Sequence, residues 1–129
     1  MEIITRHCFL IDDDDDDQLI FETTVKKYFS DYKFKGFFDF ESAEKYLDSK
    51  TLGDELIVFL DLNMPKVNGI EALEKLRNKK ETANLKIVIY STSNNPNDVK
   101  TSLNKGADAF ITKPSKIEDL VEELKPYLS

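Results

Sequence analysis

The stretch LIVFLD, which runs from Leu56 to Asp61, lies near the middle of the chain and joins five apolar residues to an aspartate. A second unbroken apolar run, IVIY, covers Ile87 to Tyr90 and is followed by Ser91. Strands buried on both faces read as continuous apolar runs, whereas half-exposed strands alternate with polar residues. These two stretches therefore predict the central strands of a parallel sheet.

Short apolar runs and segments of helical periodicity alternate along the rest of the chain. Strict alternation of this kind predicts the α/β class, a doubly wound parallel sheet with helices on both faces. Pro96 is expected at the first turn of the fourth helix, and Ser115 with Glu118 is expected to form a capping box for the last one. The five strand and helix pairs are 7–11 with 18–29, 33–40 with 43–47, 56–60 with 70–76, 87–90 with 99–103 and 109–111 with 117–128.

Length and composition predict one domain over residues 1–129. The formal net charge of -7 argues against a nucleic-acid partner, because phosphate backbones attract clustered Lys and Arg. The sequence shows neither a signal peptide nor an apolar run of about 18 residues, so a cytoplasmic protein without membrane contact is expected. The single cysteine, Cys8, is interpreted as a buried thiol.

Six consecutive aspartates, Asp12 to Asp17, follow the first expected strand. They would repel one another unless a cation or a helix N-terminus compensated their charge. Asp12 and Asp13 leave the carboxyl edge of the sheet, where open α/β sheets place their ligands, and they are the candidate metal ligands. Residues 15–17 are interpreted as solvated or as capping the next helix.

Other polar residues follow the neighbouring strands. Asp61 comes after the third strand, Ser91 ends the fourth, and Lys113 follows the fifth. Carboxylates converging on one crevice form an oxygen site suited to Mg²⁺, which commonly bridges to phosphate. A lysine and a hydroxyl beside a carboxylate nucleophile suit phosphoryl transfer, and the product would be an aspartyl phosphate on Asp61.

These residues resemble the pattern of the receiver domain of two-component response regulators. Asp12 and Asp13 match the family's acidic pair, Asp61 its phosphoacceptor, Ser91 its hydroxyl position and Lys113 its lysine. The stretches 61–69 and 106–114 resemble the family's loop after strand three and its run into strand five. The resemblance implies a flavodoxin-like (βα)5 fold with strand order 2-1-3-4-5. It also implies that the backbone carbonyl of Asn63 binds the magnesium.

The resemblance further implies a signalling role in a two-component system. A histidine kinase or phosphotransfer protein would supply the phosphoryl group, and a downstream protein would receive the signal. The domain would catalyse only its own phosphorylation and dephosphorylation, as a stand-alone monomer or weak dimer. Phe110 occupies the family's switch position, although an edge-strand core residue is an equal interpretation.

Three alternative functions are considered beside this one. A phosphohydrolase could use Asp12 and Asp14 as an Asp-x-Asp pair, but the Gly-Thr that usually follows is absent and no cap domain is present. A flavodoxin would need a first loop that cradles a phosphate, which six aspartates would repel. A receiver-like module that binds partners without phosphorylation would have the same fold, so this alternative stays open.

Overall fold

The computed structural model of the chain describes residues 4–49 and 55–129. Strands and helices alternate throughout these residues, as the apolar patterning predicts. The elements are β1 (Arg6–Ile11), α1 (Asp15–Tyr28), β2 (Tyr32–Phe37), α2 (Phe40–Ser49), β3 (Glu55–Leu60), α3 (Gly69–Arg77), β4 (Lys86–Ser91), α4 (Pro96–Asn104), β5 (Ala109–Thr112) and α5 (Ile117–Leu128).

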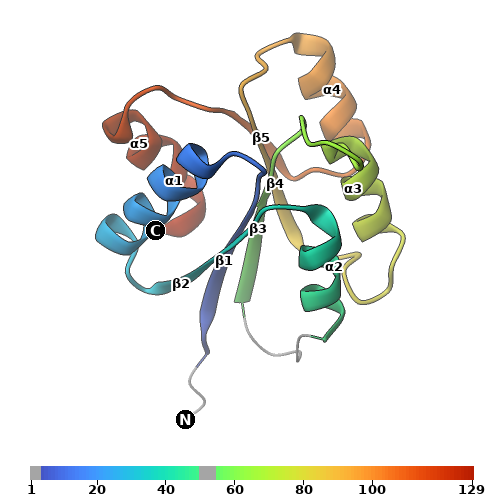
Figure 1. Cartoon of the computed structure of the whole chain (residues 1–129), viewed down its shortest axis with the longest axis horizontal. Helices are drawn as coiled ribbons and strands as arrows, with labels where there is room; N and C mark the ends of the chain where they lie inside the picture. Colours follow the sequence, from blue (N-terminus) through green and yellow to red (C-terminus); the bar gives the residue numbers. More distant parts are fainter. Residues whose placement is uncertain (1–3, 50–54) are drawn as a thin grey trace.

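The strands form one parallel sheet in the order β2-β1-β3-β4-β5, which confirms the predicted fold. Helices α1 and α5 cover one face of the sheet, and α2, α3 and α4 cover the other (Figure 1). The central strand β3 pairs with β1 and β4, so the ends of these three strands lie side by side. The loops that follow them consequently meet at the carboxyl edge of the sheet.

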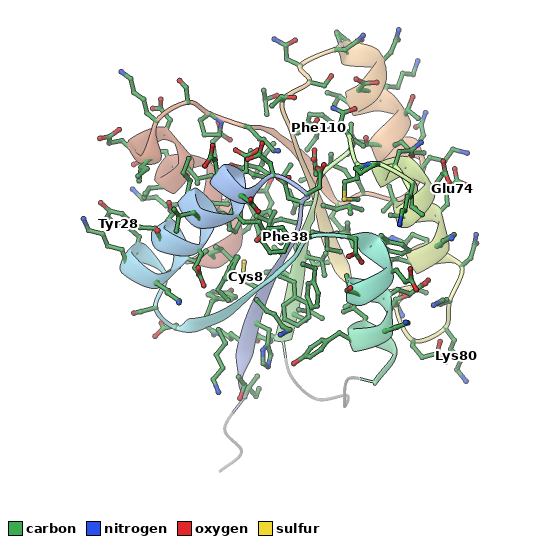
Figure 2. The ribbon with its side chains drawn as sticks, in the orientation of Figure 1. Cys8, Tyr28, Phe38, Glu74, Lys80 and Phe110 are labelled. Carbon is green, nitrogen blue, oxygen red and sulfur yellow. The ribbon has the colours of Figure 1, made fainter. Side chains whose placement is uncertain are left out.

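Alternate side chains of the central strands pack into two separate hydrophobic cores, one on each face of the sheet. On β3, Val58 and Leu60 pack with the α2 and α3 residues, whereas Ile57 and Phe59 pack with the α1 and α5 residues. Each strand therefore buries both faces, which is why its sequence is uninterrupted by polar residues. Cys8 belongs to the second core, as predicted, and burial raises the pKa of its thiol (Figure 2).

Two features of α5 differ from the sequence prediction, whereas the start of α4 agrees with it. Lys116, rather than Ser115, is the N-cap of α5, and it makes no side-chain capping hydrogen bond with the described residues. The predicted capping box is therefore wrong. Pro126 is expected from the sequence to end or kink this helix near its final turn, but it does not end it, because α5 continues to Leu128. Pro96 does begin α4, where its missing N–H has no helical partner to lose.

Apolar residues near the C-terminus mostly serve the core. Leu120 and Leu124 are fully buried in the core under α1 and α5, and Val121 packs against it. Core packing therefore explains their spacing without a dimer, although Ile117 is exposed. Phe110 on β5 is half-buried and packs against the core on the α2 and α3 side (Figure 2). This contact supports its interpretation as a core residue, while its switch role stays a prediction.

Candidate functional site

Three carboxylates meet where β1 and β3 end. Ile11 and Leu60 are paired in the sheet, and the Asp61 N–H donates to the Ile11 carbonyl at 2.9 Å. The next residues, Asp12 and Asp61, therefore leave the sheet together. Carboxylate oxygens of Asp12, Asp13 and Asp61 all lie within 4.8 Å of one another. Asp12 is completely buried and Asp61 nearly so, while Asp13 is exposed.

Lys113 brings a positive charge to this cluster from the end of β5. Its N–H donates to the Ser91 carbonyl at 2.7 Å, which fixes the chain where it leaves the sheet. Its Nζ lies 2.7 Å from Oδ2 of Asp12 and 3.8 Å from Oδ2 of Asp61. The Tyr90 ring lies beneath the ammonium, 5.4 Å from Nζ to the ring centroid. The lysine side chain is only 8% exposed, so water screens these attractions weakly.

Asp17 is a fourth member of the cluster that the sequence analysis did not single out. The Lys113 Nζ donates to its Oδ2 at 2.7 Å. Asp14 accepts a hydrogen bond from the Asp17 N–H at 2.9 Å and is the N-cap of α1. The run does cap α1, but through Asp14 rather than through any of residues 15–17, and the interpretation of Asp17 as solvated or capping was wrong. Because the six residues of the run are identical, only the residue at which α1 begins determines which carboxylate faces the lysine.

Burial and mutual repulsion shift the titration of the carboxylates. Burial raises the pKa of Asp61 to about 6, and the neighbouring Asp12 charge adds to this rise, while Lys113 opposes it. Burial likewise raises the pKa of Asp12, against the lowering effect of Lys113. Burial alone would lower the pKa of Lys113, but its contacts with Asp12 and Asp17 raise it above the ordinary value. Without a metal, the site therefore holds more negative charge than one lysine compensates.

The loop after β3 is shaped by close backbone contacts. Gly69 donates its N–H to the Leu62 carbonyl at 2.8 Å, and a Cβ at this position would lie 2.4 Å from the Asp61 carbonyl oxygen. Only glycine allows α3 to begin so close to Asp61. The Asn63 N–H donates to Asp61 Oδ1 at 3.3 Å, which orients the carboxylate. Lys66 has a φ of 68°, the one left-handed non-glycine residue in the described chain.

A solvent-open cavity of about 590 Å³ lies over the carboxylates. Of the predicted site residues, Asp13, Asp61, Asn63 and Lys113 line it, together with Thr92 and the aspartates 14–17. Asp12 lies beneath, fully buried. These positions agree with the predicted convergence on one edge of the sheet.

Ser91 has a different position from the other predicted residues. Its side chain is completely buried, and its Oγ accepts from the Ser93 N–H at 3.2 Å. Thr92 is exposed and lines the cavity in its place. Ser93 in turn donates from its Oγ to Asp98 Oδ2 at 2.5 Å, which ties the loop to the first turn of α4. The hydroxyl role of Ser91 therefore stays a prediction.

The donor set suits a small divalent cation. Mg²⁺ prefers carboxylate and carbonyl oxygens, and the three clustered carboxylates supply such ligands. Asp12 Oδ2 is buried and, although ion-paired with Lys113, makes no hydrogen bond of regular geometry with the described residues. An added cation would relieve the excess negative charge. The fit rests on the chemistry of Asp12, Asp13 and Asp61, with the exposed Asn63 beside them.

An α/β protein with this strand order belongs to the doubly wound class, and its acidic cluster lies at the carboxyl edge, where such sheets place their ligands. Within this class the family can be identified, because the family model of the response regulator receiver domain matches residues 8–125. The chain belongs to this family, whose members are signalling domains of two-component systems rather than classical enzymes.

Known proteins show the same similarity. The nitrate/nitrite response regulator NarL of Escherichia coli is 45% identical over 71 residues, which are 55% of this chain and 32% of NarL. A CheY homologue of Campylobacter jejuni is 32% identical over 75 residues, 58% of each chain. The match therefore covers less than two thirds of either relative.

A solved structure extends the similarity over nearly the whole fold. The receiver domain of a sensor histidine kinase from Pseudomonas aeruginosa, solved with magnesium in its active-site cleft, superposes with a TM-score of 0.76. The superposition covers 95% of this chain and 97% of that domain at 18% identity, a level that shows the shared fold. Among the helices of the described residues, none is long and apolar enough to cross a membrane.

Proposed function

We propose that residues 1–129 act as one receiver domain that accepts a phosphoryl group on Asp61 from a histidine kinase or a histidine phosphotransfer protein. The observation that supports this proposal most strongly is that the nearly buried Asp61 lies together with Asp12, Asp13 and Lys113 at one cavity. Asp12, Asp13, Asp61 and the Asn63 carbonyl would hold Mg²⁺. When bound, this cation supplies charge neutralisation for the phosphoryl oxygens.

The chemical step is a displacement at phosphorus. A carboxylate oxygen of Asp61 forms a bond to phosphorus as the phosphorus–nitrogen bond to the donor histidine breaks, and the imidazole keeps the electron pair and takes up a proton from water. The Lys113 ammonium, 3.8 Å from Asp61 Oδ2, attracts the phosphoryl oxygens. Ser91 would supply a hydroxyl donor after a small movement of its strand end. Charge stabilisation and positioning of this kind are the main contributions that phosphoryl transfer requires.

The signal would then leave through a protein partner. The phosphoryl group adds negative charge beside Lys113 and Ser91, and both residues would be drawn toward it. Ser91 lies next to Ser93, whose hydroxyl holds Asp98 on α4. Movement of Ser91 would therefore alter the surface formed by β4, α4 and β5, where Phe110 is the switch residue in this proposal. A protein that recognises this surface would be the downstream target.

Replacing Asp61 by asparagine is expected to abolish phosphorylation. The unmodified protein, incubated with acetyl phosphate and Mg²⁺, should gain one phosphate in its intact mass, whereas Asp61→Asn should gain none. Asp31→Asn, an exposed aspartate in the turn before β2, is the matched control and should be phosphorylated like the unmodified chain. Equal phosphorylation of Asp61→Asn would contradict the assignment of the acceptor.

Replacing Asp13 by alanine is expected to weaken magnesium binding at least tenfold, because an exposed carboxylate ligand is lost while the buried Asp12 remains. Asp13 is exposed, so the fold should tolerate the change. Titration of Mg²⁺ followed by backbone NMR signals near Asp61 measures the affinity, with Asp31→Asn again as control. An unchanged magnesium affinity in Asp13→Ala would remove Asp13 from the ligand set.

A partner-binding module without phosphorylation remains the second function. It predicts no adduct in the mass experiment and the same partner affinity with and without acetyl phosphate. A phosphohydrolase is disfavoured by the geometry of its Asp-x-Asp pair. Asp12 is completely buried against Lys113, and the Asp14 carboxylate caps α1, so neither is placed to attack a substrate.

A further inference from the structure

Gln18 is a buried amide in the first turns of α1 that none of the roles above uses. It is 6% exposed. Its Nε2 lies within hydrogen-bonding distance of three backbone carbonyls: Leu10 at 3.2 Å, Asp12 at 3.0 Å and Phe37 at 2.9 Å. Leu10 is in β1, Phe37 ends β2, and Asp12 is the first residue beyond β1. One side chain of α1 therefore joins the carboxyl ends of two neighbouring strands.

These carbonyls lie where the sheet ladder ends and the loop to α1 begins. Buried carbonyls need a donor, because an unpaired one is unfavourable in the folded state. The Asp12 N–H donates to the Phe37 carbonyl at 3.0 Å, and Asp12 Oδ1 accepts from the Asp14 N–H at 3.0 Å. Because Gln18 also donates to the Asp12 carbonyl, the Asp12 backbone N–H, backbone carbonyl and side chain each make a hydrogen bond. The amide thus completes the set of contacts that orient Asp12.

Gly36 provides the space in which the Gln18 amide lies. Gly36 is paired with Leu10 in the sheet, beside the carbonyls that Gln18 contacts. A Cβ at position 36 would lie 2.1 Å from Gln18 Oε1 and 3.0 Å from its Cδ. To relieve this overlap the amide must shift away from the position in which it contacts the carbonyls. The glycine and the glutamine are therefore sterically matched.

We propose that Gln18 is a positioning residue of the metal site, holding the chain at Asp12 so that the Asp12 and Asp13 carboxylates point toward Asp61. The preceding residue, Asp17, carries the second carboxylate that Lys113 contacts. Anchoring this turn of α1 consequently fixes both the acidic pair and one partner of the lysine. The inference deepens the proposed function and rests on its magnesium site.

The test is the magnesium affinity of Gln18→Met, which keeps the length of the side chain and removes its donors. Mutation of the residues that orient metal ligands typically lowers metal affinity about 10-fold to 100-fold, and a loss in this range is expected here. The affinity is measured by following NMR signals during Mg²⁺ titration at a temperature where circular dichroism shows the variant folded. Leu124→Ala, a fully buried residue of α5, is the control for lowered stability and should bind Mg²⁺ like the unmodified chain.

Gly36→Ala is an independent test of the positioning role, because this variant keeps the Gln18 amide. When Gln18 is present, the methyl group of Ala in Gly36→Ala should displace the Gln18 amide and lower magnesium affinity by a similar factor. In a Gln18→Ala background the methyl group meets no amide, so Gly36→Ala should cause no further loss of affinity.

The outcomes separate this inference from the function on which it rests. Absence of magnesium binding by the unmodified chain would contradict the proposed function itself. Normal binding by the unmodified chain and by Gln18→Met, or an equal loss in Leu124→Ala, would overturn the positioning role. Additive losses from Gln18→Ala and Gly36→Ala would overturn it as well, because the steric coupling would then be absent.

Discussion

Lys113→Met is expected to destabilise the magnesium-free protein by about 3–5 kcal/mol at pH 7, the usual cost of removing one partner from a buried ion pair. The lysine side chain is 8% exposed and contacts the completely buried Asp12 as well as Asp17. Methionine fills a similar space but leaves the carboxylates uncompensated in a region with little water. Urea denaturation in the presence of EDTA measures the change in the free energy of unfolding.

The dependence of this loss on pH and magnesium identifies its cause. Acid should reduce the difference between Lys113→Met and the unmodified chain, because protonation neutralises Asp12 and Asp61, whose pKa values are already raised. Mg²⁺ should reduce it too, by supplying the missing positive charge. Adding Asp12→Asn should restore part of the stability of Lys113→Met. A loss that persists unchanged in acid would point to packing rather than charge.

The matched control is Lys125→Met on α5. Its Nζ also forms an ion pair, 2.7 Å from Glu122 Oε1, but the lysine side chain is 53% exposed. Exposed pairs contribute about 0–1 kcal/mol, so this variant should hardly change stability. A similar loss in both lysine variants would contradict the role of burial.

The strand ends were predictable because parallel sheets obey simple rules. Unbroken apolar runs such as 56–60 identify the central strands, and the residue that follows each strand must lie at one edge. Asp61, Asp12 and Lys113 could therefore be grouped from the sequence alone. The strand order itself came from the resemblance to receiver domains, since alternation alone does not decide which strands are neighbours.

Other parts of the site depend on distances that a sequence does not contain. Asp17 is chemically identical to five neighbours, and only the geometry of α1 turns it toward Lys113. Gln18 is an ordinary residue for an amphipathic helix, and its three carbonyl contacts arise from strands that are remote in sequence. The capping box at Ser115 failed because a local pattern gives no information on how the loop after β5 is held.

Asp61→Asn is expected to stabilise the magnesium-free protein at pH 7 by about 3 kcal/mol while abolishing phosphorylation. The pKa of Asp61 is raised from 3.8 to about 6, and each unit corresponds to about 1.4 kcal/mol. Its ionised form is therefore unfavourable in the folded state, mainly because burial removes water and Asp12 repels it. Asparagine keeps an oxygen to accept from the Asn63 N–H but carries no charge.

The sign of the pH dependence follows from the raised pKa. Between about pH 4 and pH 6 the folded chain binds more protons at Asp61 than the unfolded chain, so this group's contribution to stability falls as the pH rises. The advantage of Asp61→Asn should therefore be absent below about pH 4, grow through this interval and level off above pH 6. Asp31→Asn, in an exposed turn, is the control for a simple change in net charge.

Magnesium should reverse the ranking of the two proteins. Binding stabilises only the folded state that holds the ligands, and the stabilisation grows as RT ln(1 + [L]/Kd). The unmodified chain should gain stability as Mg²⁺ is added, whereas Asp61→Asn, with one carboxylate of the cluster neutralised, should gain much less. Urea denaturation at pH 4 and pH 7, each with EDTA or with Mg²⁺, measures the free energy of unfolding of both proteins under all four conditions. If Asp61→Asn were less stable than the unmodified chain at pH 7 in EDTA, electrostatic strain at this site would be excluded as the basis of its metal affinity.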